Sequence, residues 1–268
     1  MSLDQIKIEK EAEKIRNSIS GKFYGISEIF KSAELLDFKV FRYPIGENSV
    51  LGIALVRRGE KVIFTNSSAI LAREIFSTAH EIGHLILHLD EKTNPAILDK
   101  DFSGENLVEK EANYFAACLL MPAEMLKKYI RLTLKKTSGD DLNGLDIARI
   151  QTVFYVSYDM VLIRLKELSI ISLAKYEELR VEKLEKTATG LLKAINGNIE
   201  LSTPSNAKKA PAEFLEYAIH NYNDYLIPFK SLKKVFDFFE LDTTFFKKEK
   251  TTEEDEESLC DILGRMEE

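Results

Sequence analysis

The sequence predicts an α+β fold in which a small β-sheet packs on a pair of helices and a mainly helical C-terminal region follows. Three observations support this prediction. Short segments with the apolar alternation and turn residues of strands occupy residues 38–65. Two apolar runs of helical length, residues 70–88 and 108–122, come next. From residue 124 onward, the apolar residues recur mainly at helical spacing.

The individual elements can be assigned in chain order. Helices are expected at 4–18 and 27–37, followed by strands at 38–43, 49–56 and 61–65. Residues 89–106 hold Asn94-Pro95 and Ser103-Gly104 and are expected to form a loop over a cleft. Later helices are expected at 124–134, 146–154, 157–168, 175–186 and as a pair within 211–241, with polar linkers at 137–144 and 202–210.

Composition indicates a globular protein of the cytoplasm. A net charge of -7 argues against non-specific binding of the whole chain to nucleic acid or to anionic membranes. The first ten residues are charged and polar, unlike a signal peptide, and no apolar run approaches the ~18 residues of a membrane span. Cys118 lies in an apolar run and Cys260 follows an acidic segment, so neither a disulfide nor a cysteine metal site is expected.

His80, Glu81 and His84 form an HExxH pattern inside the first apolar run. Residues four apart on a helix differ by about 40° and about 6 Å along the axis, so both imidazoles can bind one ion. A catalytic zinc takes three protein ligands and a water whose pKa it lowers towards ~7, and Glu81 is the expected general base. The alternative is a chance match on an amphipathic helix. Burying these groups would then be costly, and Gly83 costs ~1 kcal/mol against alanine unless something approaches its backbone closely.

The second apolar run offers the third ligand. Glu109 and Asn113 are four apart and share a helix face, so Glu109 can ligate while Asn113 hydrogen-bonds a ligating histidine. Glu111 points about 200° away from Glu109 and is expected to be solvated, which favours Glu109 over Glu111. His88 cannot join His80 and His84 on one ion, because the outer histidines of one helix would be about 12 Å apart. We expect His88 to be a supporting or core residue and His220 to be structural or exposed.

Residues 73–88 (REIFSTAHEIGHLILH) and 109–122 (EKEANYFAACLLMP) together closely resemble the ImmA/IrrE-type metallopeptidase family. The resemblance implies a zincin-like, more closely gluzincin-like, arrangement with Zn²⁺ ligands at His80, His84 and Glu109 and with Glu81 catalytic. It also implies an intracellular endopeptidase of narrow specificity that cleaves a transcriptional repressor, often a helix-turn-helix protein, in a stress response or a mobile-element switch. In zinc peptidases of this general plan, a sheet edge beside the site receives extended substrate by strand addition.

The predicted domain organisation has two parts. Residues 1–172 form the zinc metallopeptidase domain, including helix-turn-helix-like helices within 124–170 and Ser157 as an N-cap. Residues 173–268 form a helical region with a mobile acidic tail. Asp159 and Glu167 offset Arg164 and Lys166 on the second of these helices, so scaffold or protein docking is favoured over direct DNA binding.

Three functions are compatible with these residues. The zinc endopeptidase is favoured because the ligands and the base are all present. A non-catalytic, metal-stabilised regulatory protein is the second, and a zinc-dependent amide hydrolase acting on a small molecule is the third. The group that would polarise a scissile carbonyl is left open among Tyr114, Arg73 and Tyr43.

Overall fold

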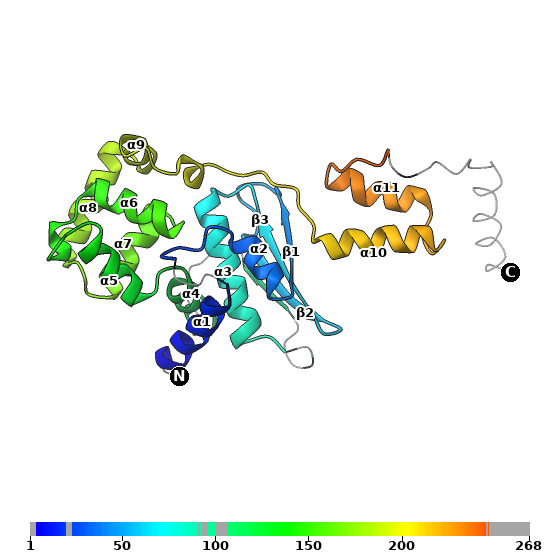
Figure 1. The fold of residues 1–268 in the computed structure, drawn as a ribbon, viewed down its shortest axis with the longest axis horizontal. Coiled ribbons are helices and arrows are strands. Elements are labelled where there is room, and N and C mark those ends of the chain that lie inside the picture. The colour runs from blue at the N-terminus through cyan, green and yellow to red at the C-terminus, as the bar shows by residue number, and fades with distance from the viewer. Residues whose placement is uncertain are drawn as a thin grey trace. The chain divides into compact units, whose positions relative to one another are not determined.

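The structure is a computed structural model that describes residues 4–19, 23–90, 92, 96–99, 107–244 and 246. The chain divides into two compact units, residues 1–211 and 212–268 (Figure 1). The first unit combines a small sheet with helices, as the predicted α+β class requires. The acidic run at 253–257, predicted to be mobile, lies outside the described residues. No helix among the described residues is long and apolar enough to cross a bilayer.

The sheet has four strands in the order β1-β3-β2-β4. They are β1 (Phe38–Tyr43), β2 (Gly52–Arg57), β3 (Glu60–Asn66) and β4 (Ala96–Asp99). β1 and β3 run parallel, whereas β2 pairs antiparallel with both β3 and β4. Arg58 and Gly59 both have positive φ and close the β2–β3 hairpin, which is the conformation that two-residue hairpin turns favour.

β4 corrects the prediction of a structureless loop at 89–106. Its four residues pair with Gly52–Leu55, and this register places Asp99 opposite Gly52. Because a four-residue strand has too few positions for a clear alternation, its pairing with β2 rather than its own sequence identifies it. β4 thus forms the outer edge of the described sheet on the side of β2.

One face of the sheet carries α3 (Leu71–Leu87), and α4 (Leu107–Leu120) packs against α3 (Figure 1). α2 (Ile29–Leu35) contacts β1 and α3, and α1 (Gln5–Ile19) packs on α4. The sheet residues that face these helices are buried and apolar: Phe38, Val40, Ala54, Val56 and Ile63. The predicted helix pair on a small sheet is therefore present, and α3 is buried between the sheet and α4.

The helices after α4 continue the same hydrophobic core. They are α5 (Ala123–Leu132), α6 (Gly144–Phe154), α7 (Tyr158–Glu167), α8 (Leu173–Lys186) and α9 (Ala188–Ala194), with short 3₁₀ helices at Gly139–Asp141 and Ile199–Ser202. α6 and α7 form the expected two-helix motif, and Ser157 caps α7 by accepting a hydrogen bond from the Met160 amide at 3.1 Å. Leu179, Leu192 and Leu201 are fully buried in this core. The first unit therefore extends to residue 211, beyond the predicted boundary at residue 172.

Residues 203–209 form backbone hydrogen bonds within the first unit, although a polar linker was predicted there. Arg42 of β1 and Lys209 exchange both backbone hydrogen bonds, each at 2.9 Å. The Arg42 guanidinium binds Glu74 of α3 with two contacts of 2.8 Å, and Ser205 Oγ donates to Glu74 at 3.0 Å. This bidentate pair connects the first turn of α3 to β1, while backbone pairing covers part of the outer edge of β1.

The second unit contains the predicted aromatic helical pair, α10 (Ala212–Asn223) and α11 (Phe229–Phe238). Ala218, Leu232 and Phe236 form its small core. Aromatic rings pack at its periphery, for example Phe214 with Phe239 at 6.4 Å between ring centroids. Phe236 belongs to the core, and Tyr222 and Phe246 pack against it.

Candidate metal centre

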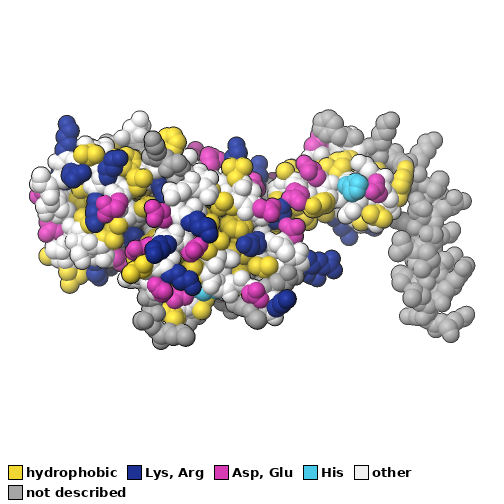
Figure 2. Space-filling view, turned by 60° about the horizontal axis from the view of Figure 1, so that its bottom comes forward, with side chains coloured by type: hydrophobic (Ala, Val, Ile, Leu, Met, Phe, Trp, Pro, Cys, Tyr) yellow, Lys and Arg dark blue, Asp and Glu magenta, His cyan; other side chains and the backbone are white. Residues whose placement is uncertain are grey.

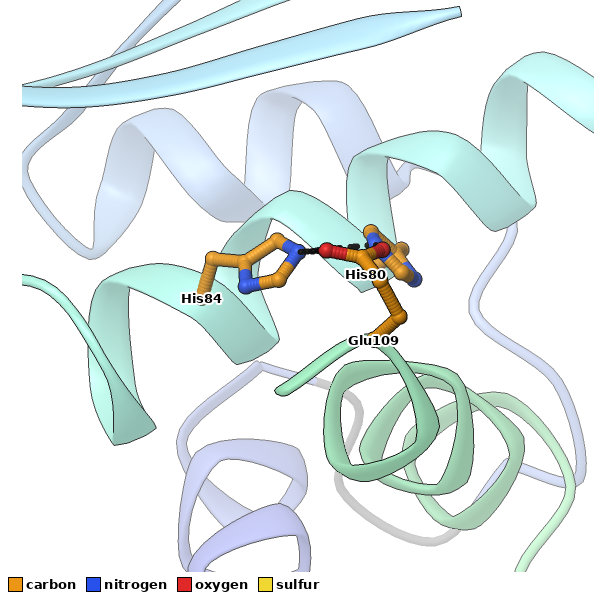
Figure 3. A group of neighbouring side chains, drawn as sticks. All are labelled: His80, His84 and Glu109. Carbon is orange, nitrogen blue, oxygen red and sulfur yellow. Dashed lines mark hydrogen bonds and ion pairs between the residues drawn. The ribbon is translucent and has the colours of Figure 1, made fainter. Parts of the chain in front are cut away.

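α3 and α4 bring three side chains to one point. His80 and His84 project from adjacent turns of α3 towards α4, and Glu109 reaches them from the first turn of α4 (Figure 3). Both imidazole side chains are 0% exposed, and that of Glu109 is 15% exposed. One ligand atom from each residue lies within 4.8 Å of the others. Among the described residues, the three predicted ligands therefore form a group that could hold a metal ion.

The Nδ1 atom of His80, on the ring side away from Glu109, contacts a specific partner. His80 Nδ1 lies 2.9 Å from Asn113 Oδ1, which is the contact expected from the spacing of Glu109 and Asn113. An amide oxygen only accepts, so His80 carries its proton on Nδ1 and directs the Nε2 lone pair inward. Asn113 thus orients the imidazole for metal coordination in the manner common around histidine ligands.

The inner atoms fit a tetrahedral ion. His80 Nε2 and His84 Nε2 are 2.9 Å apart, and the Glu109 oxygens lie 3.2 Å from His80 Nε2 and 3.5 Å from His84 Nε2. Ligand bonds of 2.0–2.2 Å at tetrahedral angles separate neighbouring donors by about 3.3 Å. Two imidazole nitrogens and a carboxylate at these separations form the nitrogen and oxygen donor set that zinc accepts. The residues present therefore fit the metal that the motif implies.

Glu111 is not solvated, so that expectation is wrong. Its Oε2 atom lies 3.0 Å from His88 Nε2, and His88 Nδ1 lies 3.0 Å from His84 Nδ1. Helix rotation correctly places Glu111 away from Glu109, but the end of α3 passes that face of α4. Burial lowers the pKa of His88, while its hydrogen bond to Glu111 acts in the opposite direction. His88 is a supporting residue, as predicted.

Glu81 points towards the sheet rather than towards α4. Its side chain is fully buried and lies against the backbone of Gly52 in β2. A Cβ placed on Gly52 would be 2.0 Å from Glu81 Oε1 and 2.7 Å from Ser77 Oγ. Only glycine leaves room for the carboxylate at this point. The sequence analysis missed Gly52, although an isolated glycine inside a strand pattern signals a close approach.

Gly83 has the role that its poor helix propensity suggested. A Cβ at Gly83 would lie 3.1 Å from Phe115 Cδ1 and 3.3 Å from the Ala112 Cα atom. α4 is therefore the close neighbour of this turn of α3. The short distance between the helices allows Glu109, on the first turn of α4, to reach both histidines.

We expect Gly52→Ala to lower peptidase activity by ~10²-fold or more while zinc content stays unchanged. The added methyl must displace Glu81 or β2, and a misplacement of about 1 Å at a reacting group costs ~10²-fold. The three heavy atoms nearest the new methyl belong to Glu81 and Ser77 and not to the metal-site residues. Turnover number and bound zinc should be measured on the same preparation.

The double variant Gly52→Ala/Glu81→Ala provides the control for Gly52. Removing the carboxylate relieves the closest clash and leaves the one with Ser77 Oγ, so its melting temperature should recover in part relative to Gly52→Ala. Wild-type activity in the single variant would contradict the placement of Glu81 against β2.

The Tyr114 side chain contacts Glu9 of α1 and Arg164 of α7. Its hydroxyl donates to Glu9 Oε1 of α1 at 2.5 Å, and the Arg164 guanidinium lies 5.5 Å from its ring centroid. Burial, with the Glu9 hydrogen bond as the next cause, raises the pKa of Tyr114. Arg73 is exposed, and the Tyr43 ring faces the Lys208 ammonium at 5.8 Å. The Tyr114 side chain is thus held by α1 and α7.

Comparison with known proteins identifies the family. Residues 33–166, half of the chain, match the family model of the IrrE N-terminal-like domain, peptidase family M78. The chain belongs to this family. The radiation response metalloprotease IrrE of Deinococcus radiodurans is 43% identical over 75 residues, which cover 25% of this chain and 23% of that protein. The match thus spans about a quarter of the curated relative. Membership of M78, a metallopeptidase family, confirms the resemblance stated from the two motif segments.

Proposed function

We propose that this chain is a zinc-dependent endopeptidase of narrow specificity. The observation that carries the proposal is the convergence of His80, His84 and Glu109, whose donor atoms all lie within 4.8 Å of one another. Such a group of acceptors, buried between two helices, is stabilised by a cation. The alternative is a non-catalytic binding protein, which would not need the glutamate of the HExxH motif. That glutamate, Glu81, is present, and its carboxylate lies against Gly52 of β2.

In the proposed mechanism His80, His84 and Glu109 hold Zn²⁺. When bound there, zinc would supply a water of lowered pKa for attack on a peptide carbonyl. Glu81 would accept a proton from the attacking water and return it to the amine leaving group. Its buried position against Gly52 keeps the carboxylate out of bulk solvent and fixed in direction. An extended substrate would pair with the outer edge of β4, next to the strand that carries Gly52.

The proposed substrate is a helix-turn-helix transcriptional repressor, cleaved in a stress response or a mobile-element switch in the cytoplasm. The family resemblance supports this substrate class, and the relative from Deinococcus radiodurans is named for a radiation response. Direct DNA binding by this chain is not proposed. Arg164 of α7 is 2% exposed and donates to the Met121 carbonyl at 3.2 Å, so it is withdrawn from the surface. On the face shown in Figure 2, basic side chains are interspersed with acidic and apolar ones.

The second unit is the proposed element of recognition or control. The first unit, residues 1–211, contains the metal centre and its supporting core, whereas residues 212–268 form a compact unit of their own. An unrestrained peptidase would harm a cell, so we infer that cleavage depends on docking of a specific protein. The proposed docking region begins at residue 212 rather than at residue 173, because α8 and α9 belong to the first core.

We expect the zinc-loaded full chain to cleave a helix-turn-helix repressor encoded beside its gene and to leave casein largely intact. A chelator should abolish the cleavage, and added zinc should restore it. A fragment ending at Pro211 should keep its zinc but cleave the repressor more slowly or without regulation. Cleavage can be followed by gel electrophoresis, with zinc content measured in parallel.

Three outcomes would contradict parts of this proposal. Rapid digestion of casein by the full chain would contradict narrow specificity. Repressor cleavage by the fragment at the rate of the full chain would remove the second unit from recognition. Chelator-resistant cleavage would argue against the metal mechanism itself.

A further inference from the structure

His88 connects the metal centre to a second carboxylate. It is the C-cap residue of α3, and its side chain is 8% exposed. One ring nitrogen, Nδ1, lies 3.0 Å from His84 Nδ1, and the other, Nε2, lies 3.0 Å from Glu111 Oε2. The backbone amide of His88 also donates to the His84 carbonyl at 3.0 Å, which holds the two residues in register. A continuous path therefore runs from Glu111 through His88 to His84.

The chemistry of the three groups allows one arrangement of protons compatible with a metal on His84 Nε2. A metal-bound Nε2 requires the His84 proton to sit on Nδ1, which then donates to His88 Nδ1. His88 must accept there, so its own proton sits on Nε2. That proton points at the carboxylate of Glu111, which accepts it. Reversing any one of these bonds would place a proton on His84 Nε2, where it would block the metal.

The two imidazoles of the metal centre are therefore oriented by different means. His80 donates directly to Asn113 of α4 at 2.9 Å. The Nδ1 side of His84 contacts His88, which lies one turn further along α3 and connects to Glu111 of α4. Both paths end on α4, the helix that also supplies Glu109. The arrangement couples the orientation of both histidines to the packing of α3 on α4.

We propose that His88 and Glu111 are positioning residues that hold His84 as the Nδ1–H tautomer, with its Nε2 lone pair directed at the metal. This inference rests on the proposed metal site. It gives Glu111, which the sequence analysis expected to be solvated, a role beside the metal site. Partners of this kind typically change metal affinity 10–100-fold when removed.

The test uses full-length His88→Phe and Glu111→Gln, with Glu124→Gln as the matched control. Phenylalanine keeps a planar ring but has no nitrogen, so His84 Nδ1–H loses its acceptor. Glutamine keeps an oxygen acceptor but lacks the charge that strengthens the bond. Glu124 carries the same charge on α5, is exposed, and pairs with Lys127 at 3.3 Å. Zinc affinity is measured by competition with a chromophoric chelator.

We expect a zinc affinity loss of about 10–100-fold in His88→Phe, a smaller loss in Glu111→Gln and none in Glu124→Gln. ¹H–¹⁵N spectra of the imidazole rings, recorded at saturating zinc, give a second readout. The Nδ1 proton of His84 should be hydrogen-bonded and slow to exchange with solvent in the wild type and in Glu124→Gln. It should exchange faster in His88→Phe, where the acceptor is gone, and to a smaller extent in Glu111→Gln. A purely structural role would not single out the Nδ1 proton of one ring.

The outcomes distinguish a failure of this inference from a failure of the proposed function. A wild-type protein that binds no zinc would reject the metal site, whatever the variants do. Normal zinc binding by the wild type, together with unchanged affinity and an unchanged His84 Nδ1 proton in both variants, would overturn the positioning role alone. Weaker zinc binding with an unchanged His84 Nδ1 proton would also overturn it, because the effect would then come from charge or packing.

Discussion

Glu81→Gln should keep its fold and its zinc and should lose cleavage of the cognate substrate by ~10² to 10⁴-fold. Glutamine has nearly the same shape as glutamate and fits the space above Gly52, so burial and packing are preserved. It cannot accept the proton of an attacking water. Because a general base acts in the transition state, the turnover number should fall while substrate binding changes little. Single-turnover cleavage, zinc content and the melting temperature measure the three quantities separately.

The same variant separates the proposed peptidase from a non-catalytic regulator. A regulator that only holds its partner should retain its biological effect in Glu81→Gln, because the metal-site residues are untouched. A peptidase should lose that effect together with cleavage. Glu124→Gln, exposed on α5, controls for loss of one negative charge. Undiminished turnover by Glu81→Gln would reject Glu81 as the base.

His84→Ala or Glu109→Ala should abolish stoichiometric zinc binding and, with it, all cleavage. Each variant leaves only two protein donors at a centre that needs three. In the wild type, excess zinc should raise the melting temperature, since a ligand at 100 times its Kd adds ~2.7 kcal/mol to stability. This increase should vanish in both variants. Metal analysis after dialysis and thermal denaturation with and without zinc provide the measurements.

His220→Ala is the matched histidine control for the metal centre. His220 is exposed on α10 and lies 3.1 Å from Asp224, within the second unit. Its removal should change neither zinc content nor the response of the melting temperature to zinc. One zinc per chain retained by His84→Ala would contradict the proposed ligand set.

Local periodicity was sufficient to predict the elements that form the candidate site. β1 has the predicted bounds of 38–43, and α3 falls inside the apolar run at 70–88. The i, i+4 spacing of His80 and His84 follows from helix geometry alone, and the same geometry places Asn113 beside Glu109. The prediction of a close approach at Gly83 also needed only helix propensity. These features depend on residues within one or two turns of each other.

The boundaries of the units could not be predicted in the same way. The charged surface of α8 suggested a connector, yet Leu179 on its inner side is fully buried in the first core. Residues 203–209 have the composition of a linker, but their backbone groups hydrogen-bond to Arg42 of β1, to Ser67 and to Leu71. Backbone pairing of this kind carries no side-chain signal. The short β4 is likewise identified by its pairing with β2 and not by its own sequence. In each case the stabilising partner lies far away in the sequence.

The sequence by itself determined the family, the helices that carry the HExxH motif and the acidic segment, and the residues suited to hold a metal. Only the tertiary structure decided that Glu81 packs against Gly52, that Glu111 contacts His88 and His88 contacts His84, and that Arg164 is buried. Helical spacing gives the direction of a side chain on its own helix. It does not say which neighbouring element passes that face, because the packing of α3 between the sheet and α4 is set by the combined burial of many apolar side chains.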